Sequence, residues 1–133
     1  MQFMMLMIPG GYENAEPGIQ LPAEGVDMMM KYNEELQKAG ILRGLNGLHP
    51  PSMGARVSFA TGSPIVTDGP FAEVKEVLGG YWVIEVGSLQ EAIEWAKKCP
   101  AQPNETIEIR QIMGEEAFSA EALEVLKKYP DVM

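Results

Sequence analysis

Asp68 has the most informative surroundings of any charged residue in this sequence, because it begins the run Asp68-Gly69-Pro70-Phe71. An aspartate followed by glycine and proline is typical of a tight turn, in which the carboxylate accepts hydrogen bonds from nearby backbone amides. A turn can also hold a carboxylate at the mouth of a pocket, where partial desolvation suits it to act as a base or to bind a ligand cation. Asp68 is therefore a candidate catalytic residue as well as a turn residue.

His49 is the single histidine of the chain. Histidine titrates near neutral pH, which suits a proton shuttle, although the prolines that follow favour a solvated loop. We take it as a second candidate catalytic residue. No second histidine and no Cys–His spacing accompany it, so the sequence predicts no metal site. Gly10-Gly11 and Gly79-Gly80 lack the strand-to-helix spacing of nucleotide-binding loops, so the sequence predicts no cofactor.

Arg56 and Arg110 lie in strand-like segments, where a guanidinium is placed against a sheet unless its strand is at an edge. A buried guanidinium needs an anion. That anion can be a carboxylate of the protein itself, with Glu108, Glu85 and Glu73 as candidates from the same or another chain. It can also be an acidic ligand held by bidentate hydrogen bonds. Both arginines are thus candidate ligand-binding residues.

Lys75 and Tyr81 complete the candidate ligand-binding set, since both closely follow the predicted turn. Lys75 stands beside Glu76, and these two residues can instead form a simple salt bridge. Tyr81 and Trp82 are neighbours in a strand-like run, so their side chains point to opposite faces of a sheet. One of them can pack against helices while the other faces a pocket.

The overall composition is that of a soluble globular domain. The 133 residues are 46% hydrophobic and 22% charged, which is enough for one core. No apolar run approaches the roughly 20 residues of a membrane helix. A formal net charge of −9 disfavours nucleic acid and anionic membranes as partners. The single cysteine, Cys99, occupies an apolar helical position, which favours a buried structural thiol in a cytoplasmic protein.

Hydrophobic periodicity divides the chain into alternating strands and helices. Alternating or continuous apolar runs predict strands, and apolar residues at spacings of three and four predict helices. The first strand is apolar throughout, which is typical of a central strand covered on both faces. The expected strands are 3–8, 41–48, 56–60, 65–67, 81–86 and 106–113, and the expected helices end at Gly40, begin at Ser88 and begin at Ser119.

The second helix has a clear start signal. Ser88 and Glu91 form a capping box, in which the serine oxygen accepts from the Glu91 amide and the glutamate accepts from the Ser88 amide. Glu94 and Lys98, one turn apart, are expected to pair on its outer face. In the third helix, Ser119 is the expected N-cap.

This order of elements predicts an α+β fold in one domain, residues 1–133, with residues 115–133 as a C-terminal helical extension. Two strand-led halves with one helix each favour a ferredoxin-like split βαβ plan, with both helices on one face of the sheet. The other face then needs a cover, because an apolar sheet face left in water is a large exposed patch. A second copy of the chain is the simplest cover, so we expect a homodimer.

The run from Val66 to Tyr81, VTDGPFAEVKEVLGGY, resembles the signature of the DGPF branch of the YCII-related family. The apolar start of the chain, the Cys99-Pro100 pair and Glu108-Ile109-Arg110 agree with it. The resemblance covers nearly the whole chain and implies a ferredoxin-like protomer in a dimeric α+β barrel. Proteins of this branch are mostly uncharacterised and are often encoded beside extracytoplasmic-function sigma factors. The founding branch has a proposed histidine–aspartate pair, but this chain has no histidine at the matching first helix.

Three functions are compatible with these features. The first is a small-molecule-binding barrel, as a binding protein or an acid–base enzyme, whose pocket near the predicted turn is lined by the six residues named above: Asp68, His49, Arg56, Lys75, Tyr81 and Arg110. The second is a non-catalytic regulatory or interaction module linked to a sigma factor, since an acidic surface suits a basic partner. The third is a structural dimer without a ligand, whose arginines are satisfied by its own carboxylates.

Overall fold

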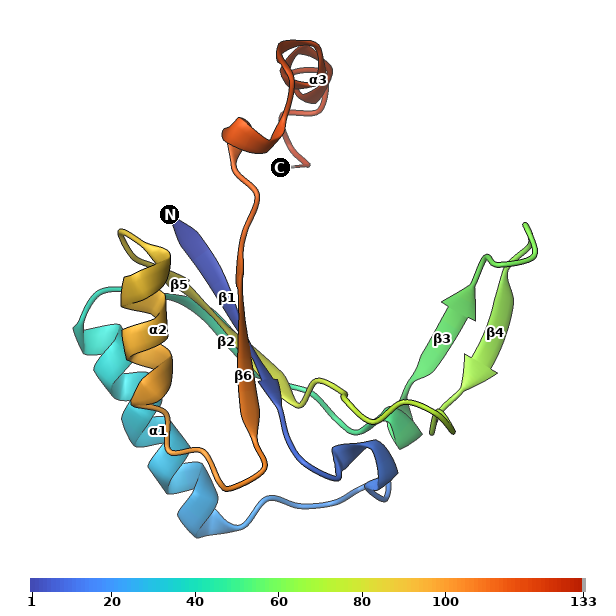
Figure 1. Ribbon diagram of the computed structural model, residues 1–133, viewed down its shortest axis with the longest axis vertical. Helices are drawn as coiled ribbons and strands as arrows, with labels where there is room; N and C mark the ends of the chain where they lie inside the picture. The colour runs from blue at the N-terminus through green and yellow to red at the C-terminus, as the bar shows by residue number, and fades with distance from the viewer. Residues whose placement is uncertain (133) are drawn as a thin grey trace.

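The computed structural model describes residues 1–132 as a mixed α+β fold with two antiparallel sheets (Figure 1). The strands are β1 (Gln2–Ile8), β2 (Leu42–Gly47), β3 (Ala55–Ser58), β4 (Ile65–Asp68), β5 (Gly80–Glu85) and β6 (Thr106–Gln111). The helices are α1 (Ala23–Lys38), α2 (Leu89–Lys97) and α3 (Ala120–Leu126), with single 3-10 turns at Tyr12–Asn14, Pro51–Met53 and Glu115–Ala117. The predicted elements are therefore present, with ends shifted by a few residues.

The main sheet has the strand order β2-β5-β1-β6, and each neighbouring pair is antiparallel. The expected central position of β1 is confirmed. The register of β2 against β5 shifts between Leu42 and Gly44, so the glycine-rich sequence of β2 produces an irregularity in its pairing. β3 and β4 form a separate two-stranded hairpin rather than joining the main sheet. The described residues form no closed barrel within one chain.

Both α1 and α2 lie on one side of the main sheet, as the sequence predicts (Figure 1). They cover a core to which β1 contributes Phe3, Met5 and Met7 and β5 contributes Trp82 and Ile84. Because strand side chains alternate between faces, the intervening residues of β1 point away from the helices. The expectation that β1 is buried on both faces is wrong for a single chain, since those intervening residues are only partly buried.

The helix ends follow the sequence in most respects. Gly40 follows α1 with φ of 74°, a left-handed conformation that glycine adopts at little cost. Ser88 caps α2 by accepting from the Glu91 amide at 3.2 Å. The Glu91 carboxylate, however, accepts from the amide of Gly87 rather than that of Ser88, at 3.2 Å, so the predicted reciprocal bond is displaced by one residue. Ser119 caps α3 through the Ala122 amide.

None of the helices within residues 1–132 is both long enough and apolar enough to cross a membrane.

Candidate functional site

The Asp68 turn is held by backbone packing. The amide of Gly69 donates to the carbonyl oxygen of Gly54 at 2.9 Å, and a Cβ at Gly69 would overlap the carbonyl oxygen of Pro51. Glycine is therefore required here by close approach of two backbone segments. Asp68 itself pairs through its backbone with Ala55 and is exposed. Within residues 1–132 its carboxylate has no hydrogen bond or ion pair, so the local hydrogen bonds predicted for it are absent.

Arg56 lies on the neighbouring strand of the hairpin, opposite Thr67. Its guanidinium carbon lies 4.3 Å from the centre of the Phe71 ring, a distance typical of a cation–π contact. The aromatic residue of the signature thus contacts the arginine. Strand alternation puts Arg56 and Asp68 on opposite faces of the hairpin, because Asp68 is opposite Ala55.

His49 and Lys75 are exposed and lie on loops. The loop of His49 is fixed on both sides, since the Tyr12 hydroxyl donates to the Leu48 carbonyl at 2.6 Å and Pro50 is fully buried. Burial raises the pKa of Tyr12, so its hydroxyl remains a donor further into the alkaline range. Lys75 makes no ion pair with Glu76 in the described part of the chain.

Tyr81 and Arg110 lie on the helix-free face of the main sheet. Tyr81 is opposite Leu6 and Arg110 is opposite Met4, both on the face of β1 that points away from the helices. The Tyr81 hydroxyl accepts from the side-chain amide of Asn46 at 3.0 Å. Tyr81 and Arg110 are on strands either side of β1 and are offset by two residues along it, so their backbones are about 12 Å apart.

The guanidinium of Arg110 pairs with the Glu108 carboxylate at 3.3 Å, and Arg110 remains 72% exposed. Glu108 was one of the protein carboxylates expected to satisfy a strand arginine. Because β6 is an edge strand, the guanidinium is not forced into the core. An exposed pair of this kind contributes little to stability and leaves most of the five N–H donors of arginine unoccupied.

The six predicted residues therefore form two groups and two single positions. Arg56 and Asp68 lie on the hairpin, Tyr81 and Arg110 lie on the helix-free sheet face, and His49 and Lys75 occupy the loops. None of these six residues lines either of the two clearest surface depressions, which are described next.

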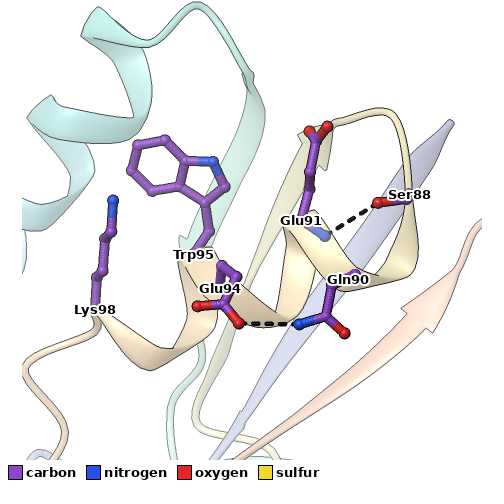
Figure 2. A pocket seen from close by; sticks show the side chains of 6 residues that line it. All are labelled: Ser88, Gln90, Glu91, Glu94, Trp95 and Lys98. Carbon is purple, nitrogen blue, oxygen red and sulfur yellow. Dashed lines mark hydrogen bonds between the residues drawn. The ribbon is translucent and has the colours of Figure 1, made fainter.

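The first depression, of about 270 Å³, lies on the outer surface of α2 (Figure 2). Figure 2 shows the Lys98 ammonium beside the Trp95 ring, 4.4 Å from the ring centre, while the Glu94 carboxylate accepts a hydrogen bond from the Gln90 side chain. Glu94 instead pairs with Lys97 at 3.1 Å, so the predicted Glu94–Lys98 pair is wrong. Hydrogen bonds within the helix occupy most of these polar groups, and the depression is a feature of the helix surface.

The second depression, of about 460 Å³, lies where β1 begins and β6 ends. It is lined by Met1, Gln2, Gln111, Ile112, Met113, Gly114 and Glu116. Part of its lining belongs to the segment that leads to α3. Sequence reasoning missed it, because no motif marks the junction between a strand end and a chain extension.

Sequence reasoning also missed Asn46 and Glu13. Asn46 contributes the amide that orients Tyr81, and no motif surrounds it. One carboxylate oxygen of Glu13 is buried without a hydrogen-bond partner among the described residues. Glu13 lies in the 3-10 turn after β1, a loop that the sequence marks only by its glycines and prolines.

Comparison with known proteins gives a family and one relative. The model of the YCII-related domain matches residues 1–116, which include the whole main sheet, the hairpin and the six candidate residues. An uncharacterised protein of Rhizobium meliloti (strain 1021), R00369, is 42% identical over 60 residues, which are 45% of this chain and 48% of that protein. The match thus spans about half the length of this curated relative. Because the family model covers most of the sequence, the chain belongs to the YCII-related family.

Proposed function

We propose that this protein is a homodimeric small-molecule-binding protein, a dimeric α+β barrel in which the ligand lies between the helix-free face of one sheet and the second copy. The order strand, helix, strand, strand, helix, strand in the main sheet, with the hairpin inserted between β2 and β5, supports a ferredoxin-like protomer. Such a protomer has a single helix layer and leaves the opposite sheet face for an intersubunit contact.

The composition of the helix-free face carries this proposal. Its centre is apolar, with Met4, Leu6 and Val83 on the two inner strands, and all three are only partly buried. Polar side chains surround this centre, and two of them have side-chain partners there, Tyr81 in Asn46 and Arg110 in Glu108. An apolar floor with a few fixed polar groups is the usual composition of a small-molecule site.

Arg110 favours a small carboxylic acid as the ligand. Its guanidinium contacts Glu108 through one nitrogen, and the remaining donors can bind a planar carboxylate in bidentate geometry. Tyr81 can donate its hydroxyl proton to the same ligand while it accepts from Asn46. Acid–base catalysis by Asp68 or His49 is a further step, which needs the second copy to desolvate them, since both are exposed in one chain.

A thermal-shift screen of small carboxylic acids tests the proposal. A ligand present at 100 times its Kd stabilises the folded state by about 2.7 kcal/mol, which a melting curve detects readily. We expect Arg110→Gln and Tyr81→Phe to lose most of this shift. Lys38→Gln, on the outer face of α1, removes a charge without touching the sheet and should retain it. Equal shifts for all four proteins would refute the site.

The alternative is a regulatory or interaction module linked to an extracytoplasmic-function sigma factor. Two observations favour it: neither surface depression contains a candidate residue, and the net charge of −9 suits a basic partner. Mixing the purified protein with such a sigma factor from the same genome should then give a complex that weakens as salt is raised. Absence of a complex at low salt excludes this function.

A further inference from the structure

The β3–β4 hairpin stands apart from the rest of the fold. It shares no hydrogen-bonded strand pair with the main sheet, and every residue of both strands is exposed. Figure 1 shows it on the opposite side of the main sheet from α1 and α2. An isolated two-stranded hairpin is at best marginally stable in water. This hairpin therefore needs a surface to pack against.

Its side chains are those of a contact surface. Four large apolar residues are exposed within this short segment: Val57 at 52%, Phe59 at 69%, Ile65 at 49% and Val66 at 65%. Val57 and Val66 are directly opposite each other, so they form one apolar patch on one face of the hairpin. Exposed apolar clusters of this kind mark interaction sites.

The charge of the hairpin favours a second copy of this chain as the partner. Between Ala55 and Asp68 the only charged side chains are Arg56 and Asp68, which sum to zero. The chain as a whole carries −9, so two copies repel each other unless their contact avoids acidic residues. The hairpin carries no net charge, so it adds no net repulsion between the copies, although Asp68 lies on the same face as Val57 and Val66.

The area of the sheet face leads to the same partner. Four strands spaced about 4.8 Å apart and about 20 Å long present roughly 400 Å² on one face. A stable dimer buries about 800 Å² on each partner. As a projected area, the sheet face is thus about half of that figure, and it is a small interface by itself. A projecting hairpin on the same side of each copy can supply much of the difference.

We propose that the β3–β4 hairpin is an intersubunit arm that packs its Val57–Val66 patch on the second copy of this chain. The inference rests on the proposed dimer and adds to it. Under two-fold symmetry each copy both extends an arm and receives one. The signature turn after β4 is then the fixed base from which the arm extends, which agrees with the close packing of Gly69 against residues 51–54.

Photo-crosslinking tests the contact directly. Benzoylphenylalanine is incorporated in place of Phe59 or, as a control, in place of Leu21, which is 74% exposed on the loop before α1. We expect illumination to give a covalent dimer for position 59 and none for position 21. A protein that is dimeric by light scattering but gives no crosslink at position 59 overturns the arm and leaves the dimer intact.

The strength of the contact is measured with Val66→Lys and the control Leu21→Lys. Val66→Lys places an unpaired charge in an apolar contact, and the change occurs twice in a symmetric dimer, so the dimer Kd should rise by about tenfold or more. Leu21→Lys should change it less than about twofold. An unchanged Kd for Val66→Lys overturns the arm. A monomeric wild-type protein would refute the proposed dimer as well as the arm. If Val66→Lys does not fold, the crosslinking result at position 59 tests the arm instead.

Discussion

At the scale of single residues, the polar chemistry beneath the helices is already satisfied. The Trp82 indole donates to the Asn33 amide oxygen at 2.7 Å, and the Tyr32 hydroxyl donates to the Trp95 carbonyl at 2.7 Å. The Tyr32 and Trp82 rings also meet edge to face, 5.7 Å apart. Removing one partner of a buried hydrogen bond costs about 1–3 kcal/mol. These bonds fix α1 and α2 on the sheet and use the polar groups of Trp82, Asn33 and Tyr32, so these groups are not available to a ligand.

Cys99 is expected to react slowly. Burial, with a smaller effect from Glu105, raises the pKa of its thiol from the ordinary 9.0 to about 11. At pH 8 this lowers the thiolate fraction roughly a hundredfold, while the more basic thiolate is up to about tenfold more nucleophilic. Folded protein should therefore react with a disulfide reagent about tenfold more slowly than protein unfolded in urea. Equal rates would contradict a raised pKa for the Cys99 thiol.

The raised pKa of Cys99 also makes the free energy of unfolding depend on pH. Because the folded-state pKa is the higher one, the folded state holds the proton more tightly. The stability contribution of Cys99 is complete below pH 9 and is lost as the pH rises towards 11. Cys99→Ser should flatten this alkaline loss in urea titrations between pH 8 and 11. An identical slope for variant and wild type would assign the loss to other groups.

Asp68→Asn and Asp68→Ala should each change the free energy of unfolding by less than about 0.5 kcal/mol. The carboxylate is exposed and has no partner among the described residues, and substitutions at such positions are usually this small. Urea unfolding measures both variants. If Asp68→Ala alone loses more than about 1 kcal/mol, the carboxylate has the turn role after all. A ligand that wild type binds and both variants do not would place its charge in a site.

At the scale of elements, the loops at one end of the sheet form a bonded cluster. The segments after β1 and β2 are joined by two side-chain hydrogen bonds, Tyr12 to Leu48 and Ser52 to Ala15. The Gly79 backbone joins both, since its amide donates to Met7 and its carbonyl accepts from the Leu48 amide. The signature run thus connects the hairpin to this cluster at Gly69 and to the sheet at Gly79.

Gly69→Ala should destabilise the protein by about 2 kcal/mol or more, because the added methyl group meets backbone that cannot move aside easily. Gly47→Ala in β2 is the matched control, since no atom lies within 4 Å of its added Cβ. It should cost less than about 0.5 kcal/mol. Both are measured as the free energy of unfolding in urea. Similar values for the two variants would mean that the close packing of Gly69 is not required.

The sequence predicts the elements well and their placement less well. Periodicity and start signals locate the strands and helices, because these depend on residues close together in the chain. The displaced Gly87–Glu91 bond and the Glu94–Lys97 pair depend on rotamers, which spacing does not determine. The six candidate site residues lie in separate places because their positions depend on how distant segments pack, which local sequence patterns do not determine. A hairpin signal predicts that β3 and β4 pair, but not that they stand clear of the main sheet.

At the scale of the whole molecule, one face of the main sheet is covered by helices and the other face is open. The helix-covered face of the sheet is closed by a continuous core. On the opposite face, the β1 side chains are only partly buried. The hairpin extends beyond one end of the sheet and α3 beyond the other (Figure 1). Residues 117–132 lie outside the matched family domain, so α3 is an addition to it. Covering the helix-free face of the sheet is the simplest role for a second copy.

Leu6→Lys tests that role at the centre of the helix-free face, on the central strand β1. In a sheet-to-sheet dimer, two-fold symmetry brings a new charge from each copy into one apolar interface, and an unpaired buried charge is very unfavourable. We therefore expect Leu6→Lys to be a folded monomer by light scattering at micromolar concentration, while wild type and Leu21→Lys are dimers. A lysine on a wet sheet face can extend to solvent, so far-UV circular dichroism of the monomer should match wild type. A dimeric Leu6→Lys would place the interface elsewhere on the molecule.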